Sequence, residues 1–301
     1  MKILVTGGAG FIGTNLIKQL LKQGHYVVSL DNYSTGIKKN HIDNPNVVYV
    51  ESDILNLTEH NSSFWSKFDL VYHLAAIARI QPSFNNPLDY FKVNTLATMK
   101  LAEECSKSDI PLIYAGSSSH HSGKYKNPYT FSKTSGEEVL EMFKQNFGLK
   151  YVIARFYNVY GPHQLTEGGY TTLIGRWIGN IQNARPCVIY GDGEQRRDFT
   201  HVDDIVQGLI KMNSDKVLSI YNGYNFELGR GKNYSVNEIA KMFEFTPAYE
   251  PAKKGETRNT LCKDTLAKEI LGWEPKRELV DYIKPWFKYK IKHENKFNTT
   301  K

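Results

Sequence analysis

Residues 2–13, which read KILVTGGAGFIG, decide the fold of this chain. The apolar run at 2–6 predicts a β-strand, and the amphipathic stretch Phe11–Gln23 predicts a helix directly after it. Between them the chain turns through Gly7, Gly10 and Gly13. A side chain at such a turn would keep a pyrophosphate away from the N-terminus of the helix. The three glycines therefore predict a dinucleotide site at the end of the first strand.

Asp31, at the end of the second predicted strand, strengthens this interpretation. A carboxylate at this position accepts hydrogen bonds from the adenosine ribose hydroxyls and repels a 2′-phosphate. The segment that follows, residues 32–36, contains no arginine that would attract such a phosphate. The sequence therefore predicts that the cofactor is NAD and not NADP.

Short apolar runs alternate with amphipathic stretches through the first half of the chain. Such runs are typical of parallel strands that are covered on both faces. The alternation predicts an α/β fold with a doubly wound, Rossmann-like parallel sheet. The further predicted strands are Tyr26–Asp31, Val47–Asp53, Leu70–Ala76, Pro111–Ser118 and Tyr151–Tyr157, and the predicted helices are Phe11–Gln23, Pro87–Lys107 and Tyr129–Asn146.

The pattern loosens after Gly161. We expect a dinucleotide-binding domain at 1–162 and 199–224, and a smaller, partly interleaved C-terminal substrate lobe at 163–198 and 225–301. The helices predicted in this part of the chain lie at about 170–183, 202–212, 235–243, 265–271 and 279–288.

The composition is that of an ordinary globular protein, with 41% hydrophobic and 23% charged residues among 301. Glycines and lysines interrupt the apolar opening segment, so we expect no membrane segment or signal peptide and a cytoplasmic location. The three cysteines are far apart and show no metal-ligand spacing, so no metal site is expected. Much of the formal charge of +7 lies at 286–301. We expect a solvated chain end there and no nucleic-acid partner.

Tyr129 and Lys133 are the candidate catalytic pair. A spacing of four residues puts both side chains on one face of the predicted helix. A free phenol has a pKa near 10 and needs help of roughly 3 units to act as a base at neutral pH. The ammonium of Lys133 and a positively charged nicotinamide would supply it by favouring the phenolate. The serine run Ser117–Ser119, at the end of the fifth predicted strand, supports this interpretation.

With these residues the chain resembles the extended short-chain dehydrogenase/reductases of the NAD-dependent epimerase/dehydratase family. Within that family it is similar to the UDP-glucose and UDP-N-acetylglucosamine 4-epimerases, over nearly its whole length. The matching motifs are Thr6–Gly13, Asp31-Asn32, Asp53-Ile54, His73–Ala76, Asn94, Ser118, Tyr129, Lys133, Arg155–Asn158, Gly191–Gly193, Arg197–Phe199 and Val202–Asp204.

The resemblance implies a role for each matching position. Ser118, Tyr129 and Lys133 would be catalytic, and the helices at about 87–107 and 129–147 would join two copies in a homodimer. Besides the glycines, Asp31 and the catalytic pair, the implied cofactor residues are Phe11, Ile12, Asn32, Asp53, Ile54, Leu74, Ala75, Ala76, Asn94 and Tyr157. The implied substrate residues are Ser83, Ser118, Ser119, Asn158, Thr172, Leu173, Arg197 and Arg258. The planar forks of the two arginines suit the phosphate oxygens of a UDP-sugar.

Two departures from the family pattern bear on the reaction. The related 4,6-dehydratases carry an Asp-Glu pair where this chain has Ser119 and His120, and the decarboxylases carry a glutamate at the second position. His121-Ser122-Gly123 replaces the usual Val-Tyr-Gly, and only residues 124–128 separate it from Tyr129. A loop this short does not predict how the sugar pocket is closed. His120 is a candidate to line that pocket.

The sequence therefore predicts an NAD-dependent 4-epimerase that oxidises C4 of a UDP-hexose transiently and then returns the hydride. The hexose would be glucose or galactose, their N-acetylated amino sugars, or glucuronate. Three other enzymes stay open as alternatives: a 4,6-dehydratase, in which His120 would act as base or acid, a decarboxylase, and a 4-ketoreductase. A non-catalytic NAD- or RNA-binding relative is a more distant alternative.

Overall fold

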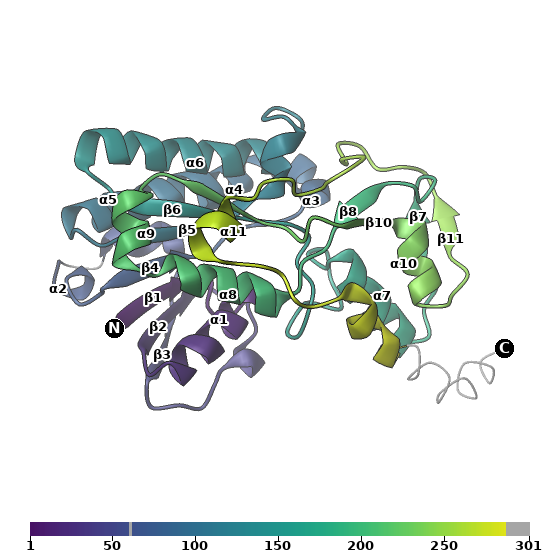
Figure 1. The fold of residues 1–301 in the computed structure, drawn as a ribbon, viewed down its shortest axis with the longest axis horizontal. Helices are drawn as coiled ribbons and strands as arrows, with labels where there is room; N and C mark the ends of the chain where they lie inside the picture. The colour runs from purple at the N-terminus through teal and green to yellow at the C-terminus, as the bar shows by residue number, and fades with distance from the viewer. Residues whose placement is uncertain (60–61, 287–301) are drawn as a thin grey trace.

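A parallel sheet of seven strands forms the centre of the molecule, with the order β3-β2-β1-β4-β5-β6-β9 (Figure 1). The computed structural model describes residues 1–59 and 62–286. All six pairings between neighbouring strands are parallel. The strands are β1 (Lys2–Thr6), β2 (Tyr26–Asp31), β3 (Val47–Glu51), β4 (Leu70–His73), β5 (Leu112–Ser117), β6 (Tyr151–Phe156) and β9 (Asn225–Leu228).

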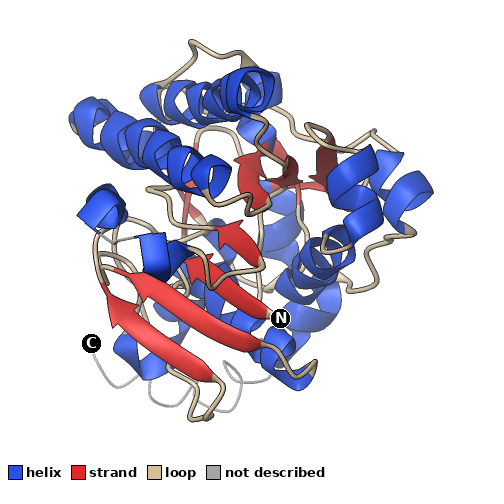
Figure 2. Cartoon of the chain, turned by 90° about the vertical axis from the view of Figure 1, so that its left-hand side faces the viewer, coloured by secondary structure: helices blue, strands red, loops and turns tan. Residues whose placement is uncertain are grey.

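Helices cover both faces of this sheet (Figure 2). On one face lie α1 (Phe11–Lys22), α8 (Val202–Met212), α9 (Asp215–Ile220) and α11 (Leu266–Leu271), which share a core with the sheet. On the other face lie α2 (Ser62–Trp65), α5 (Ala97–Lys107) and α6 (Pro128–Phe147). Because the strands are buried on both sides, their near-continuous apolar sequences are explained. The predicted doubly wound α/β fold is confirmed.

The predicted strands are all present, but several end earlier than expected. The predicted strand Leu70–Ala76 ends at His73, because the ladder stops there. Leu74 N still bonds to the backbone oxygen of Thr6, at 3.1 Å, whereas Ala75 N bonds to the Thr6 side chain.

The predicted helix Pro87–Lys107 is divided into three segments. It consists of α4 (Pro87–Phe91), a π-helical segment η3 (Lys92–Leu96) and α5.

A second lobe lies beyond the carboxyl ends of the strands and has its own core (Figure 1). Its helices are α7 (Leu173–Gln182), α10 (Val236–Met242) and residues 279–286. Two small sheets complete it: β8 (Arg196–Asp198) pairs with β10 (Asn233–Ser235), and β7 (Val188–Tyr190) pairs with β11 (Ala248–Glu250).

The expected division of the chain needs one correction. Residues from 225 onward were expected in the substrate lobe, yet β9 pairs with β6 in the main sheet, and α11 packs into the core beside it. We therefore propose that the first lobe also contains 225–228 and 266–271. Short strands that extend a sheet edge carry little signal of their own in sequence.

None of the helices in the described ranges is long and apolar enough to cross a membrane. Apart from Trp286, the basic chain end predicted to be solvated lies outside the described residues.

Candidate active site

A cavity of about 1030 Å³ opens at the carboxyl ends of the central strands, between the sheet and the second lobe. It lies where β1 has β2 on one side and β4 on the other. In an open α/β sheet this change of direction leaves a crevice between the loops that leave the two neighbouring strands. The cavity is therefore where the topology predicts a ligand.

The glycine turn at the start of α1 has no room for side chains. A Cβ on Gly13 would lie 2.3 Å from the backbone oxygen of Gly7. Gly7 has φ +71°, and a Cβ there would lie 2.8 Å from Ala75 N. Gly10 is the N-cap of α1 and offers no side-chain hydrogen bond to it. The first N–H groups of the helix thus have no capping side chain, which fits the binding of a pyrophosphate.

Asp31 lies beside this turn and lines the cavity. Its Oδ2 accepts a hydrogen bond from Ala9 N at 3.0 Å, and its Oδ1 accepts one from Tyr33 N at 2.8 Å. Burial raises the pKa of the carboxyl group, and the two backbone hydrogen bonds oppose that rise. The neighbouring lining residues, Asn32, Ser34 and Thr35, carry no positive charge. This arrangement fits a ribose with free hydroxyls.

Tyr129 enters the cavity from the first turn of α6, which Asn127 caps by accepting a hydrogen bond from Thr130 N at 2.8 Å. The Tyr129 hydroxyl donates to Ser117 Oγ at 3.2 Å. Sequence reasoning singled out Ser118, which lines the cavity and is buried, but missed the contact with Ser117. Both serines lie at the end of β5, and one serine position cannot be told from the next by sequence pattern alone.

The electrostatics of the catalytic pair differ from the expectation. Burial lowers the pKa of Lys133 to about 7, and its Nζ lies 4.1 Å from the centre of the Tyr114 ring. Burial raises the pKa of Tyr129, while the Ser117 hydrogen bond and the charge of Arg79 lower it. The cation whose charge lowers the pKa of Tyr129 in this structure is Arg79, a residue that sequence reasoning did not select.

His120 and His121 do not line the cavity. His120 Nδ1 lies 3.1 Å from Glu137 Oε2, and His121 Nε2 lies 2.9 Å from Glu227 Oε1. Arg155, on β6, joins the two glutamates: its Nη2 is 2.5 Å from Glu137 Oε2, and its Nη1 is 3.1 Å from Glu227 Oε1. This buried cluster turns both histidines away from the sugar pocket. The idea that His120 lines that pocket is wrong.

The short loop before Tyr129 is covered by a distant segment, residues 252–258. Ser122 Oγ lies 2.8 Å from Thr257 Oγ1, and Asn127 Nδ2 donates to the Gly255 oxygen at 3.4 Å. From the other side, Gln81 Nε2 donates to the Lys254 oxygen at 3.0 Å. The segment therefore supplies the closure that the loop itself is too short to make.

Most of the expected binding residues line the cavity. The lining set includes the three glycines, Phe11, Ile12, Asp31, Asn32, Ile54, Leu74–Ala76, Ser118, Ser119, Tyr129, Lys133, Asn158, Thr172, Leu173, Arg197 and Arg258. Arg258 forms a two-fold ion pair with Asp192, at 2.7 and 2.8 Å, and Arg197 Nη2 lies 3.3 Å from Glu256 Oε2.

Four expected residues lie outside the cavity lining. Ser83 is buried and donates to its own helix, to the Ile80 oxygen. Asn94, in the π-helical segment, binds both the N–H and the C=O of Ile77 and so holds the cavity wall from behind. Asp53 accepts hydrogen bonds from Asn32 and Leu55, and Tyr157 is buried. Ser83, Asn94 and Asp53 thus contact residues that line the cavity, and the sequence pattern does not distinguish such a supporting position from a lining one.

The model of the NAD dependent epimerase/dehydratase family matches residues 3–222. The chain belongs to this family. It is an enzyme of a group that acts on UDP-sugars, and NAD is its cofactor.

Several members of known structure or sequence are similar to it. The UDP-glucose 4-epimerase of Thermotoga maritima, solved with UDP-glucose, is 30% identical with a TM-score of 0.85, over 98% of this chain and 100% of its own. The UDP-glucuronic acid 4-epimerase of Bacillus cereus, solved with UDP-glucuronic acid and NAD, is 28% identical with a TM-score of 0.84, over 97% and 99%. UDP-glucuronic acid decarboxylase 4 of Arabidopsis thaliana is 27% identical over 92% of this chain and 65% of its own length.

The position of Asp31 predicts the choice between NAD and NADP. We expect the protein to bind NAD at least tenfold more tightly than NADP, because the carboxylate repels the 2′-phosphate. Asp31→Asn removes that charge and should narrow the ratio of the two dissociation constants, measured by calorimetry. Asp43→Asn, at an exposed position nearby in sequence, is the matched control. Equal affinity of the unmodified protein for both cofactors would contradict the assignment.

Proposed function

We propose that the protein is an NAD-dependent UDP-sugar 4-epimerase. The observation that carries this proposal is the environment of Ser119 and His120. Elimination of water from C5 and C6 requires a base and an acid at these two positions, and decarboxylation in the family places a glutamate at the second. Serine is too weak an acid for the first role, and His120 lies beside Glu137 and outside the cavity lining. C4 oxidation and reduction need neither group.

In the proposed reaction Tyr129 takes the proton of the sugar C4 hydroxyl. A serine hydroxyl at the end of β5 would stabilise the oxygen. The candidates are Ser117, which accepts a hydrogen bond from Tyr129, and Ser118, which also lines the cavity. Arg79 stabilises the phenolate by its charge. Lys133 would hold the nicotinamide ribose of NAD, and the cofactor would supply the hydride acceptor and donor that exchange at C4 requires.

Turning the 4-keto sugar over demands tight nucleotide contacts and weak sugar contacts. We expect Arg197 and Arg258 to bind the diphosphate, and Asn158, Thr172 and Leu173 to lie along the nucleotide. All five residues line the cavity. Each of the two arginines forms an ion pair, Arg197 with Glu256 and Arg258 with Asp192. The diphosphate would replace these two carboxylates. The positive charges of Arg197 and Arg258 would therefore be paired both before and after the substrate binds.

The mass of the product tests the reaction type. The NAD-loaded protein is incubated with UDP-glucose, UDP-N-acetylglucosamine and UDP-glucuronate, and the products are analysed by mass spectrometry and NMR. We expect a C4 epimer of unchanged mass from at least one of them. A product lighter by one water would identify a dehydratase, and loss of carbon dioxide would identify a decarboxylase.

Replacing the proposed base tests the catalytic assignment. Tyr129→Phe keeps the ring but removes the proton acceptor, so turnover should fall about 100-fold or more. Binding of the sugar nucleotide should change little. Tyr125→Phe, at a side chain that is 83% exposed, is the matched control. A Tyr129→Phe enzyme that keeps more than a tenth of the normal rate would overturn the assignment.

We also propose that two copies associate through α4, α5 and α6. This side of the molecule exposes a group of large apolar side chains, and an apolar group of this kind is typical of a contact surface. The group comprises Leu88, Phe91, Leu96, Met99 and Met142. Helices α5 and α6 pack against each other, and their outer faces would complete a four-helix bundle with a second copy.

A charge on this surface should separate the copies. Leu88 is 61% exposed, and Leu88→Glu should shift the mass measured by light scattering from dimer to monomer. Ile220→Glu provides the control, since Ile220 is 63% exposed but lies at the end of α9, on the other face of the sheet. A monomeric unmodified protein would contradict the proposed dimer.

A further inference from the structure

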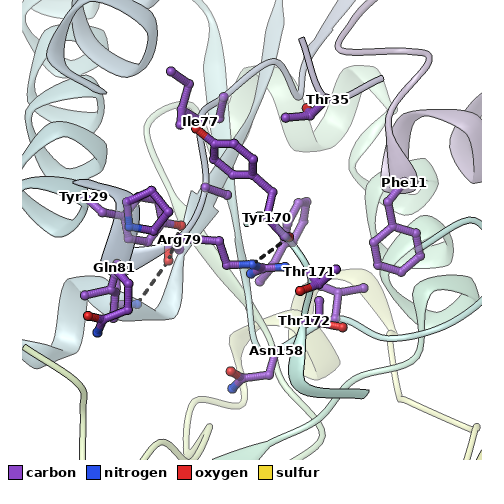
Figure 3. A pocket seen from close by; sticks show the side chains of 18 of the residues that line it. Phe11, Thr35, Ile77, Arg79, Gln81, Tyr129, Asn158, Tyr170, Thr171 and Thr172 are labelled. Carbon is purple, nitrogen blue, oxygen red and sulfur yellow. Dashed lines mark hydrogen bonds between the residues drawn. The ribbon is translucent and has the colours of Figure 1, made fainter. Parts of the chain in front are cut away.

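Arg79 projects into the cavity from the loop that follows β4. It is the residue before α3 (Ile80–Asn85), and its φ of +130° is unusual for a residue with a side chain. Its Nε donates to the backbone oxygen of Tyr170 at 3.0 Å, across the cavity in the second lobe (Figure 3). A strained backbone at a cavity wall is a common sign of a functional constraint. Here it directs a guanidinium into the cavity.

This guanidinium has no acidic partner among the described residues. Burial lowers the pKa of Arg79, and the field of the Glu256 carboxylate opposes that effect weakly. That carboxylate is already bound by Gln81 and by Arg197. An enclosed charge without a counter-ion is costly, and a bound anion would remove the cost.

A second arginine, Arg176 on α7, lines the same cavity. Its Nε donates to Thr171 Oγ1 at 3.1 Å, one residue along from the Tyr170 oxygen that holds Arg79. It too forms no ion pair within the described part of the chain. The two guanidiniums are close enough that the charge of Arg176 lowers the pKa of Arg79. Tyr170 and Thr171, adjacent in one loop, thus orient the guanidiniums of Arg79 and Arg176 toward the same cavity.

The diphosphate does not account for this pair, because Arg197 and Arg258 are already placed to bind it. Arg79 instead lies near the catalytic phenol: its charge lowers the pKa of Tyr129, and both side chains face the same part of the pocket (Figure 3). Tyr129 must reach the C4 hydroxyl. A group near Tyr129 therefore lies near the ring atoms beside C4, and the C6 substituent is attached to one of them.

We propose that the sugar carries a carboxylate at C6, and that Arg79 and Arg176 bind it. The substrate would then be a UDP-hexuronic acid. This inference rests on the proposed 4-epimerase function, which places C4 beside Tyr129. A carboxylate suits the site because its two oxygens can accept from both planar guanidiniums at once.

Binding measured by calorimetry on the NAD-loaded protein tests the proposal without requiring turnover. We expect UDP-glucuronate to bind at least tenfold more tightly than UDP-glucose, as expected for a charge-assisted contact. Equal affinity, or tighter binding of UDP-glucose, would overturn the inference. An absence of C4 epimers together with the expected preference would refute the epimerase and leave the carboxylate site standing.

Two variants locate the contact. Arg79→Gln should bring the two dissociation constants to within about twofold of each other, and Arg176→Gln should reduce the preference in the same direction. The second variant keeps the test valid if the strained position 79 does not tolerate glutamine. Arg185→Gln, which breaks an exposed pair with Glu167, should retain the full preference.

UDP without a sugar serves as the third ligand. If Arg79→Gln weakens UDP as much as it weakens UDP-glucuronate, the guanidinium contacts the diphosphate and the proposal is wrong. If UDP-glucuronate alone loses affinity, the contact is with the sugar carboxylate.

Discussion

The buried ion cluster of Glu137, Arg155 and Glu227 is the interaction on which the site depends. Arg155 lies on β6 and contacts one glutamate on α6, the helix that carries Tyr129, and one on β9, the last strand of the sheet. All three side chains are almost fully buried. Removing one member would leave a charge in the interior without its partner, at a cost of about 3–5 kcal/mol. The cluster therefore fixes α6, and with it Tyr129, relative to the edge of the sheet.

The same cluster explains why His120 and His121 lie outside the cavity. Its two glutamates also face His120 and His121, so the catalytic loop is held with these imidazoles outside the cavity. Burial favours the neutral form of Glu137, but its contacts with His120 and Arg155 bring the pKa below the usual value. The Glu137 carboxylate is thereby kept ionised and paired. It does not line the cavity, which supports the proposed hydride exchange over elimination.

The arginines that line the cavity are of two kinds, those that form an ion pair with a carboxylate and those that do not. Arg197 and Arg258 rest on acidic partners, which a diphosphate can replace. Arg79 and Arg176 rest on a backbone oxygen and a hydroxyl, which satisfy hydrogen bonds but leave the charge unbalanced. The first kind suits a group that every nucleotide substrate carries. The second kind suits a group that distinguishes one sugar from another.

The sequence by itself determined the doubly wound sheet, the glycine turn, Asp31 and the pair Tyr129 and Lys133. These features are local: periodicity, a turn without side chains and a spacing of four residues are all read within one segment. Only the tertiary structure decided that β9 joins the main sheet, that residues 252–258 cover the short catalytic loop, and that Arg79 faces Tyr129.

The physical reason is that these contacts join segments far apart in the chain. Ser122, just after β5, and Thr257 are 135 residues apart and meet only because the segment 252–258 packs against the loop before α6. His120 and His121 carry no local sign of direction, and their orientation follows from glutamates 17 and 106 residues away, on α6 and β9. The strained conformation of Arg79 has no sequence signature either, since glycine is the residue expected where φ is positive.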